Sequence, residues 1–521
     1  MVNYKNKNVI MVVLDTHRYD RLGAYGYARP TSPNLDSLAA ESMFFERAVA
    51  PGQWTIPSHA SLFSGEVPAV HKTVQADDYL PIEFETLAGR LSSTGVRTTG
   101  FCNNPLVGIV QNGFTRGFDE FYNYCGVVPS TPQKEINDIW KPMRKLWAKY
   151  TQILRRLSYP IQNAFASPNE FFIGALRPLF VPLWTKAANF KGMTARSITE
   201  TARFMEKIET SRDAGNFVFL NLMETHLPYS PPAEFIKTFV PYYHETPEAE
   251  QFMRSFNRKA MQWLIPLIKP FNDLEKTTLS GMYDAEVAYQ DHLLAQLIST
   301  LNSSYHRENT MVIFLADHGE MLGEHGFMGH GFGVYEELIH VPLFIRVPDI
   351  LSAKKIDKRV SITQLFYTIL DFFGFDSLAM PYADEIDVGS KSFLRMKWME
   401  DASPSYIISE AYAPENALKI MNSHAKELIS RHHAEQTRYA VYHHDEKMLA
   451  VGDLSRVLYD LAGDPEEGRP YQNEARIGEL SSILDKYLDL AETHQSGSSH
   501  RKISLKDELI QQRLRDLGYL E

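Results

Sequence analysis

Three apolar runs constrain the fold of this chain more than any other feature. Residues 9–14, 217–222 and 311–316 are almost entirely apolar and rich in β-branched or aromatic side chains. Strands that are buried on both faces of a parallel sheet have this composition. Helical periods lie between the runs, over residues 33–46 and 283–301. Strands that alternate with helices predict an α/β fold with a doubly wound, mostly parallel sheet flanked by helices.

Chemically active side chains follow each of the three predicted strands. Asp15 follows the first strand, Glu224-Thr225-His226 the second, and Asp317-His318 the third. In doubly wound sheets, ligands bind at the carboxyl ends of the strands. We therefore expect these side chains to meet in a single site.

A second, smaller domain is expected because the chain of 521 residues is too long for one ordinary domain and changes character near residue 376. The elements expected beyond that point are three short antiparallel strands, a helix, a polar linker and a final helix, over residues 406–411, 438–442, 457–461, 473–492, 493–500 and up to Leu520. The predicted division is a large α/β domain over residues 1–375 and a C-terminal α+β subdomain over residues 376–521.

The charge of the chain argues against a nucleic-acid partner, since its formal net charge is −11 and nucleic-acid-binding domains usually have a basic surface. The two cysteines, Cys102 and Cys125, are too few for a disulfide framework and favour a reducing compartment. No signal-peptide pattern precedes the first strand, and no run of about twenty apolar residues predicts a transmembrane segment. These features predict a cytoplasmic protein.

Thr55 begins the run Thr55-Ile56-Pro57-Ser58-His59, which continues to Leu62, Ser64 and Gly65. On its own, this run is typical of a helix start, with Ser or Thr at the N-cap and Pro in the first turn. The chemical interpretation is that the Thr55 hydroxyl, beside a metal ion, attacks an electrophilic phosphorus. The other motifs of the chain favour the chemical interpretation.

The run resembles the signature of the sulfatase family of the alkaline-phosphatase-like superfamily, Cys/Ser-x-Pro-Ser-Arg followed by a small residue, Leu, any residue, Thr/Ser and Gly. The chain is also similar to that family in Asp15-Thr16-His17-Arg18 and in Asp317-His318-Gly319 with the residues that follow. Later matches reach Leu520, so the resemblance spans nearly the whole chain except residues 130–195. It implies the family's α/β fold and makes residues 1–375 the catalytic domain.

The resemblance implies a metal site. In the family, the first Asp, the later Asp-Asn/His pair and the nucleophile hold a divalent ion, which assigns Asp15, Asp317, His318 and Thr55 as ligands. Thr16 stands where the family has a second Asp. Two carboxylates, one imidazole and one alkoxide suit Mn²⁺, Zn²⁺ or Mg²⁺ better than the all-oxygen cage of Ca²⁺, with Mn²⁺ or Zn²⁺ favoured. One metal ion is expected.

The resemblance assigns two further histidines to the substrate. His226 lies in a segment similar to the family's His-x-Pro-Tyr and is expected to act as a general acid or oxyanion stabiliser. His330 lies between two glycines, where a Lys or His of the family touches the transferred anion. These two side chains are also the ones that would help to hold a second metal ion.

Positions 55 and 59 separate this chain from true sulfatases. In sulfatases the residue matching Thr55 is oxidised to formylglycine, which threonine cannot become. His59 replaces the family Arg that supports formylglycine and the anion, and we expect His59 and Arg18 beside the substrate or the metal ligands. Both differences favour phosphoryl chemistry, in which Thr55 attacks a phosphate ester and water then cleaves the phosphothreonine.

Residues 130–195 interleave basic and apolar side chains in a helical pattern, and a second such stretch covers residues 242–271. The plain interpretation is a helical insert packed on the core. The functional interpretation is a lid or a membrane-surface platform. We expect a small-molecule or lipid-like anionic ester as the substrate, and the sequence leaves peripheral membrane contact and a homo-oligomer open.

Together, these features predict a metal-dependent hydrolase of phosphate esters, acting on a phosphodiester or a phosphonate monoester, or a transferase of the same group. Two other functions stay open. One is a sulfuric ester hydrolase that acts without formylglycine. The other is a catalytically silent binding protein, which the loss of the second Asp and of the Arg favours, and which the retained nucleophile and metal ligands disfavour.

Overall fold

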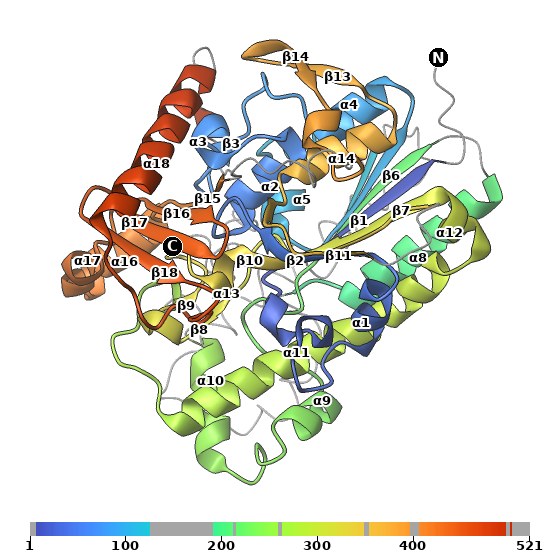
Figure 1. The fold of residues 1–521 in the computed structure, drawn as a ribbon. Coiled ribbons are helices and arrows are strands. Elements are labelled where there is room, and N and C mark those ends of the chain that lie inside the picture. Colours follow the sequence, from blue (N-terminus) through green and yellow to red (C-terminus); the bar gives the residue numbers. More distant parts are fainter. Residues whose placement is uncertain are drawn as a thin grey trace, which may run out of the picture.

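The computed structural model describes residues 7–124, 191–211, 215–258, 263–348, 354–395, 406–495 and 501–502. Of the expected insert over residues 130–195, only residues 191–195 lie within this part, and Cys125 and the final helix up to Leu520 lie outside it. Figure 1 shows a central sheet with helices on both faces and a second, smaller sheet in the C-terminal part. The predicted α/β class with a smaller C-terminal sheet subdomain is confirmed.

The central sheet has nine strands in the order β11-β2-β10-β7-β1-β6-β4-β5, with β12 paired to β2. Their bounds are β1 (Asn8–Leu14), β2 (Met43–Val49), β4 (Arg97–Cys102), β5 (Glu120–Asn123), β6 (Asn216–Leu222), β7 (Thr310–Leu315), β10 (His340–Arg346), β11 (Lys354–Ile356) and β12 (Val360–Ser361). Strand β10 is antiparallel to β2 and β7, and the other pairings are parallel. Leu14 pairs with Leu222, and Val13 pairs with Leu315. The three predicted strands therefore lie side by side and end at the same edge.

Alternate side chains of β1 pack into two apolar layers. Val9, Met11 and Val13 join the layer of α2 (Thr55–Ser64), α4 (Leu87–Ser93) and α14 (Gln364–Phe372). Ile10, Val12 and Leu14 join the layer of α1 (Pro33–Ala39), α8 (Thr194–Ser211) and α11 (Asp273–Leu301). Because helices cover both faces, every side chain of this strand is buried, which explains its continuous apolar run.

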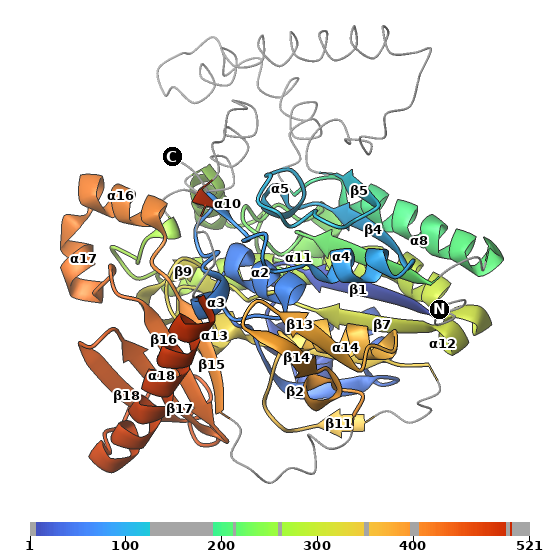
Figure 2. The same ribbon diagram turned by 90° about the horizontal axis from the view of Figure 1, so that it is seen from above.

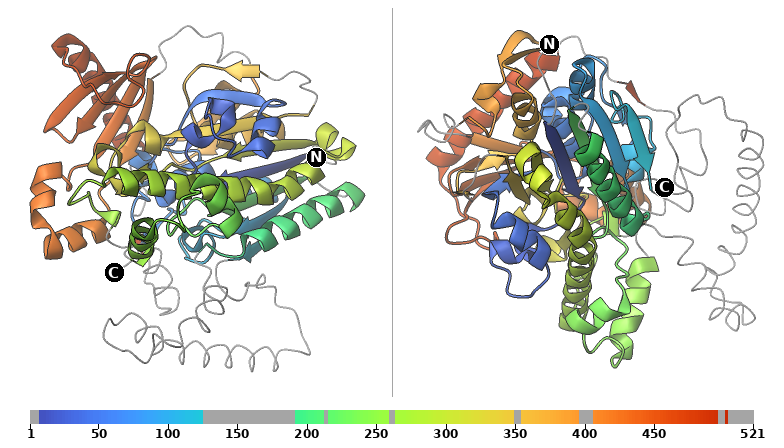
Figure 3. Two further views of the ribbon diagram at one scale, coloured as in Figure 1. Left: turned by 90° about the horizontal axis from the view of Figure 1, so that it is seen from below. Right: turned by 90° about the vertical axis from the view of Figure 1, so that its right-hand side faces the viewer.

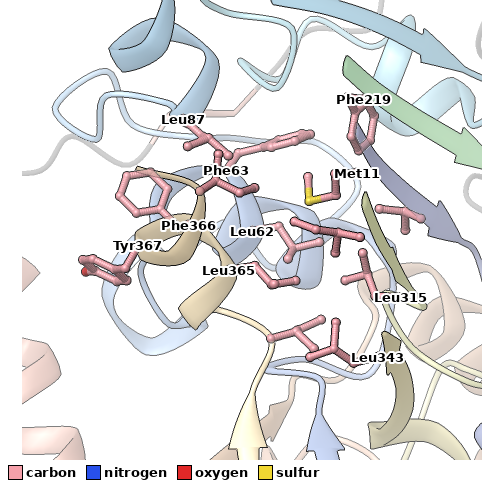
Figure 4. Close-up of a cluster of buried hydrophobic side chains, with 14 of the residues drawn as sticks. Met11, Leu62, Phe63, Leu87, Phe219, Leu315, Leu343, Leu365, Phe366 and Tyr367 are labelled. Carbon is pink, nitrogen blue, oxygen red and sulfur yellow. The ribbon is translucent and has the colours of Figure 1, made fainter. Parts of the chain in front are cut away.

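Figure 4 shows the first of these layers, where Met11 and Leu315 of the sheet lie beside Leu62 of α2 and Leu365 of α14. All ten residues of α2 are buried. A helix enclosed in this way cannot shift without breaking close packing, so its first residue has a defined position at the edge of the sheet.

The helix predicted over residues 33–46 is shorter in the structure. Helix α1 ends at Ala39, and β2 begins at Met43. Phe44 and Phe45 of β2 pair with residues of β10. Strand pairing to β10 outweighs the local helical period, so the helix prediction beyond Ala39 was wrong. By contrast, the helix predicted over residues 283–301 is confirmed and starts earlier, because Asn272 and Glu275 form a capping box at the start of α11.

Apart from α10, the remaining helices that precede the C-terminal sheet are short. They are α3 (Pro68–His71), α5 (Pro105–Gly108), α9 (Ala233–Phe239), α10 (Pro247–Arg258), α12 (Ser304–Asn309) and α13 (Glu336–Ile339), with 3-10 turns η1 (Tyr19–Arg21), η2 (Gly23–Tyr25), η4 (Glu324–Gly326) and η5 (Gly389–Lys391). Helices α9 and α10 extend from the side of the molecule that α11 covers (Figures 1 and 3). Met253 and Phe256 of α10 pack with Met282 and Tyr283 of α11. The second apolar stretch, residues 242–271, thus contributes to a core where it is described.

The C-terminal part forms a four-stranded antiparallel sheet beside the main body (Figure 2). Its elements are β15 (Tyr406–Ala411), β16 (Arg438–His443), β17 (Glu446–Val451), β18 (Ser455–Asp460), α16 (Glu415–His424), α17 (Lys426–His432) and α18 (Glu474–Gln495). The three predicted strands are confirmed, and β17 was not predicted. Helix α18 packs Leu480 and Leu484 on the sheet and continues to Gln495, so the first three residues of the predicted linker are helical.

Three two-stranded pairings complete the described chain: β3 (Asp78–Tyr79) with β19 (Arg501–Lys502), β8 (Met321–Leu322) with β9 (Met328–Gly329), and β13 (Ser377–Met380) with β14 (Ala383–Asp387). Among the described residues, we find no helix with the length and apolar character needed to cross a membrane.

A buried ion pair joins Lys191 to Glu286 of helix α11. The Lys191 ammonium donates to Glu286 Oε1 at 2.5 Å and to the backbone carbonyl of Glu224 at 2.5 Å. The Ser230 N–H also donates to Glu286 Oε1, at 2.6 Å. Burial nevertheless raises the pKa of Glu286 to about 7, with Lys191 opposing the shift.

Glu286 should make the stability of the protein depend on pH. Its pKa in the folded state lies above its ordinary value of 4.5, so its contribution is present below about pH 4.5 and is lost as the pH rises towards 7. Relative to Glu286→Gln, we expect the wild-type free energy of unfolding to fall by roughly 3 kcal/mol across that window. Urea titrations at several pH values measure it. The exposed Glu234→Gln variant is the control and should follow the wild type; identical curves for Glu286→Gln and wild type would contradict the assignment.

Candidate active site

Thr55 is the first residue of α2 and is completely buried. The N-cap of this helix is Trp54, and no side chain caps the helix end. The Thr55 hydroxyl instead lies 3.3 Å from His318 Nε2. The plain interpretation of the motif is correct for the backbone, since a helix does start here, but the threonine side chain is directed at a histidine beyond the end of β7.

The chain turns sharply after β1 and presents Asp15 to the same place. Thr16 has a φ of 60°, a left-handed conformation that is an outlier for a β-branched residue. The hydroxyls of Thr16 and Thr225 both donate to the Asp15 backbone carbonyl, each at 2.6 Å. Backbone strain of this kind occurs mainly where the surrounding structure holds a functional residue in place.

Asp15, Asp317 and His318 form one buried group. Each offers a ligand atom within 4.8 Å of the others, and all three are fully buried. His318 Nε2 lies 3.5 Å from Asp317 Oδ2 and 3.8 Å from Asp15 Oδ1. Gly319 allows this arrangement, because a Cβ there would lie 1.9 Å from the Glu337 carbonyl oxygen. Within the described ranges this is the single group of three or more His, Cys, Asp or Glu side chains at this spacing.

The hydrogen bonds of this group indicate a cation site. His318 Nδ1 lies 2.8 Å from the Gly319 carbonyl, which can only accept, so the neutral ring carries its proton on Nδ1 and a lone pair on Nε2. Asp15 Oδ1 and Asp317 Oδ2 are buried without a hydrogen-bond partner. Three electron-pair donors facing one another in a buried site are costly unless a cation lies among them. Two carboxylates and one imidazole fit a divalent metal ion.

The pKa values of these three side chains also favour a cation site. Burial and the charge of Asp317 raise the pKa of Asp15 well above its usual range. Burial also acts against ionised Asp317, but His318 and His59 outweigh it and lower the pKa of Asp317. Burial lowers the pKa of His318 to about 4, so its ring is neutral near pH 7, as a metal ligand must be. A cation would remove the repulsion between the two carboxylates.

Two asparagines that were not predicted support Asp15. Asn104 Nδ2 donates to Asp15 Oδ2 at 2.6 Å, while its Oδ1 accepts from the Leu106 N–H at 2.9 Å, which fixes the orientation of the amide. Asn221 is a polar neighbour of Asp15 that acts to lower the Asp15 pKa. Asn221 is the polar residue of an otherwise apolar run, and Asn104 precedes Pro105 just after β4; these were the available sequence signals.

His59 lies behind the ligands, where it is fully buried. Its Nδ1 is 3.0 Å from the Thr55 carbonyl oxygen and 3.3 Å from Asp317 Oδ2, and its Nε2 is 3.4 Å from the Asn221 amide nitrogen. His59 thus contacts both the start of α2 and Asp317, which is a supporting position.

His330 lies beside His318, and His226 lies beside His330. The ring centroid of His330 is 4.7 Å from that of His318 and 5.0 Å from that of His226. Burial, together with His330, lowers the pKa of His226 to about 3, and its Nδ1 lies 2.7 Å from the Leu227 carbonyl. The neutral ring therefore carries its proton on Nδ1. Glu320, which was not predicted, lies 2.8 Å from His330 Nδ1.

Arg18 is buried, and carboxylates surround its guanidinium. It forms ion pairs with Asp20 at 2.7 Å and Glu324 at 2.6 Å, and it donates to the Glu320 carbonyl at 3.1 Å. Four other histidines contact side chains outside this group: His17 contacts Gln290, His71 contacts Ser61, His325 contacts Glu337 and His340 contacts Tyr19.

Comparison with known proteins places this site in context. A family model described as Sulfatase matches residues 7–375. The chain is 23% identical over 379 residues to the Uncharacterized sulfatase YidJ of Escherichia coli strain K12, covering 70% of this chain and 67% of that protein. It is 23% identical over 381 residues to an arylsulfatase of Clostridium perfringens, covering 70% and 74%. A phosphonate monoester hydrolase of Agrobacterium radiobacter has the same fold, with a TM-score of 0.61 at 20% identity over 95% and 99% of the two chains.

Proposed function

Because this chain belongs to the sulfatase family of ester hydrolases, we propose that it hydrolyses a phosphodiester or a phosphonate monoester with Thr55 as the nucleophile. One observation carries the proposal: the Thr55 hydroxyl lies 3.3 Å from His318 Nε2, in the group that Asp15 and Asp317 complete. The motif of Thr55 also aligns it with the residue that becomes formylglycine in sulfatases.

Threonine favours phosphorus over sulfur as the electrophile. Its hydroxyl is a secondary alcohol, so oxidation would give a ketone and not the aldehyde of formylglycine. The elimination that frees sulfate from a formylglycine hydrate is therefore absent, and a second displacement must free the enzyme. Phosphoryl groups undergo successive in-line displacements readily.

The proposed reaction has two displacements. In the first, the bond between Thr55 Oγ1 and phosphorus forms while the bond to the leaving oxygen breaks, and the alcohol leaves with the proton that the hydroxyl gives up. In the second, water attacks phosphorus, the bond to Oγ1 breaks, and a water proton returns to Thr55. Attack by an alcohol in place of water would complete transfer.

The side chains around Thr55 suit these steps. The first free N–H groups of α2 can bind a non-bridging oxygen of the substrate. His226 was expected to act as a general acid or oxyanion stabiliser, but its Nε2 carries a lone pair, so we assign it instead to the proton of the attacking water. We assign His330, which was expected to touch the transferred anion, to the leaving oxygen. Asp15, Asp317, His318 and Thr55 would hold a divalent ion, with Mn²⁺ or Zn²⁺ favoured. When bound, such an ion would supply positive charge that stabilises the oxyanions of both steps.

Mass spectrometry of the peptide that contains Thr55 tests the proposal. The metal-loaded protein is mixed briefly with an aryl phosphodiester, quenched and digested. We expect a phosphoryl-type adduct on Thr55 and none on the same peptide of Thr55→Ala. Turnover without any adduct on Thr55, in both rapid-quench and steady-state samples, would contradict the nucleophile.

A sulfuric ester hydrolase is the second candidate, because the two curated relatives above are named as sulfatases. Parallel assays with an aryl sulfate and an aryl phosphodiester, normalised to metal content, separate the two. Faster turnover of the sulfate would overturn the phosphoryl assignment. The cytoplasmic location, the division at residue 375 and the expectation of one metal ion stay predictions.

A further inference from the structure

Glu320 is a buried carboxylate with no part in the reaction described so far. It follows Gly319 directly and is 0% exposed. Burying a carboxylate is costly unless hydrogen bonds compensate its charge. Both of its oxygens and its backbone carbonyl are engaged, so the contacts of this residue indicate what it does.

The contacts of Glu320 converge on His330. Oε1 lies 2.8 Å from His330 Nδ1, and Oε2 accepts from the Tyr229 hydroxyl at 3.4 Å. The Glu320 carbonyl accepts from Arg18 Nη1 at 3.1 Å. Tyr229 thus holds the carboxylate, Arg18 holds the backbone of the same residue, and the carboxylate is oriented towards the imidazole.

The backbone around His330 explains why such a contact is needed. Glycines occupy positions 329, 331 and 333 around His330. Two of them, Gly329 and Gly333, have positive φ angles of 72° and 104°. Glycine-rich backbone has unusual conformational freedom, so it positions a side chain poorly on its own. Among the described interactions of His330, the contact with Glu320 is the one hydrogen bond of its ring.

We propose that Glu320 is a positioning residue, which accepts the Nδ1–H of His330 and thereby directs the Nε2–H of the same ring at the leaving oxygen, so that both ring nitrogens act as donors. This inference rests on the proposed function, in which His330 faces that oxygen. The ring centroid of His330 lies 4.7 Å from that of His318, whose Nε2 lies 3.3 Å from the Thr55 hydroxyl. Loss of a carboxylate that orients an imidazole in this way commonly lowers activity by about 10- to 100-fold.

A double-mutant cycle tests the inference. The variants are Glu320→Ala, His330→Ala and both together, assayed with a phosphodiester that has a poor alkyl leaving group. We expect Glu320→Ala to lower kcat by about 10- to 100-fold with little change in KM, and the double variant to be no slower than His330→Ala. With an activated aryl leaving group, which needs less assistance, the effect should shrink to within about threefold. Independent, multiplicative losses would overturn the proposal.

Glu320→Gln guards against a folding defect, because its amide oxygen can still accept the Nδ1–H. It should keep kcat within about fivefold of the wild type, and the Nδ1 resonance of His330 in histidine-labelled protein should shift. An unchanged resonance would contradict the contact. The matched control is Glu337→Gln, since Glu337 lies 3.6 Å from His325 in a carboxylate–imidazole pair away from Thr55. It should alter neither readout.

The outcomes keep the two proposals apart. If the Thr55 adduct does not form in the wild type, the proposed function fails, whatever the cycle shows. If the adduct forms and the losses at Glu320 and His330 are independent, the nucleophile stands and the positioning role fails.

Discussion

Replacing Thr55 by alanine is expected to lower kcat for a phosphodiester by about 10⁴-fold or more, the scale on which loss of a catalytic nucleophile acts. The reason is that no displacement at phosphorus can begin without Oγ1, which lies beside the metal-ligand group. The folded state should change little, because the hydroxyl makes one side-chain contact and such a bond contributes about 1 kcal/mol. Steady-state kinetics and urea denaturation measure the two effects.

Thr55→Ser is the matched comparison, since serine keeps the hydroxyl and loses the methyl group. We expect it to retain activity within about tenfold of the wild type and to form the same covalent adduct. Wild-type activity in Thr55→Ala would assign the nucleophile elsewhere and leave water, activated in the same site, as the attacking group.

Asp15→Asn is expected to abolish metal-dependent activity and to have opposite effects on stability with and without metal. A divalent ion at about 1,000 times its Kd should raise the wild-type free energy of unfolding by about 4 kcal/mol. The variant should gain much less, because it lacks one of the two carboxylates. Loss of a residue that hydrogen-bonds to a metal ligand costs up to about 100-fold in metal affinity. Loss of a direct ligand should therefore weaken metal binding by at least about 100-fold.

Without metal, the same variant should be more stable than the wild type near pH 8. Burial and Asp317 raise the pKa of Asp15, so its ionisation destabilises the folded protein as the pH rises above the ordinary value of 3.8. Asparagine keeps the Asn104 bond and carries no charge. Thermal or urea unfolding of chelator-treated protein, with metal content measured alongside, checks the prediction. A metal-free variant that is less stable than the wild type would show that the two carboxylates do not repel each other.

The C-terminal sheet is linked to this chemistry through the backbone that precedes Thr55. Gly52 forms a parallel bridge with Glu410 of β15, and the Glu410 N–H donates to the Pro51 carbonyl at 3.0 Å. Gln53 Nε2 donates to the Tyr412 carbonyl at 2.8 Å. The segment that leads into α2 is therefore held by both sheets, and the smaller sheet contributes to the position of Thr55.

Much of the fold follows from local pattern. A strand buried on both faces must be apolar throughout, so the apolar runs that end near Asp15 and Asp317 could be recognised in the sequence. The same reasoning failed over residues 40–46, where pairing with β10 makes a strand of a segment with a helical period. Strand β17 contains the short apolar run Met448–Val451, which was not predicted as a strand; the structure places it between β16 and β18.

The sequence by itself determined the three central strands, their carboxyl edge, and the residue types Asp15, Thr55, Asp317 and His318, because strand periodicity and motif residues are properties of neighbouring positions. The tertiary structure alone decided the partners: Asn104 and Asn221 on Asp15, His59 under Asp317, and Glu320 on His330. Most of these contacts join segments far apart in the chain. Even Glu320 and His330, ten residues apart, meet only because the chain between them folds back through the β8–β9 pair. Such pairings depend on how elements pack, and no local spacing encodes them.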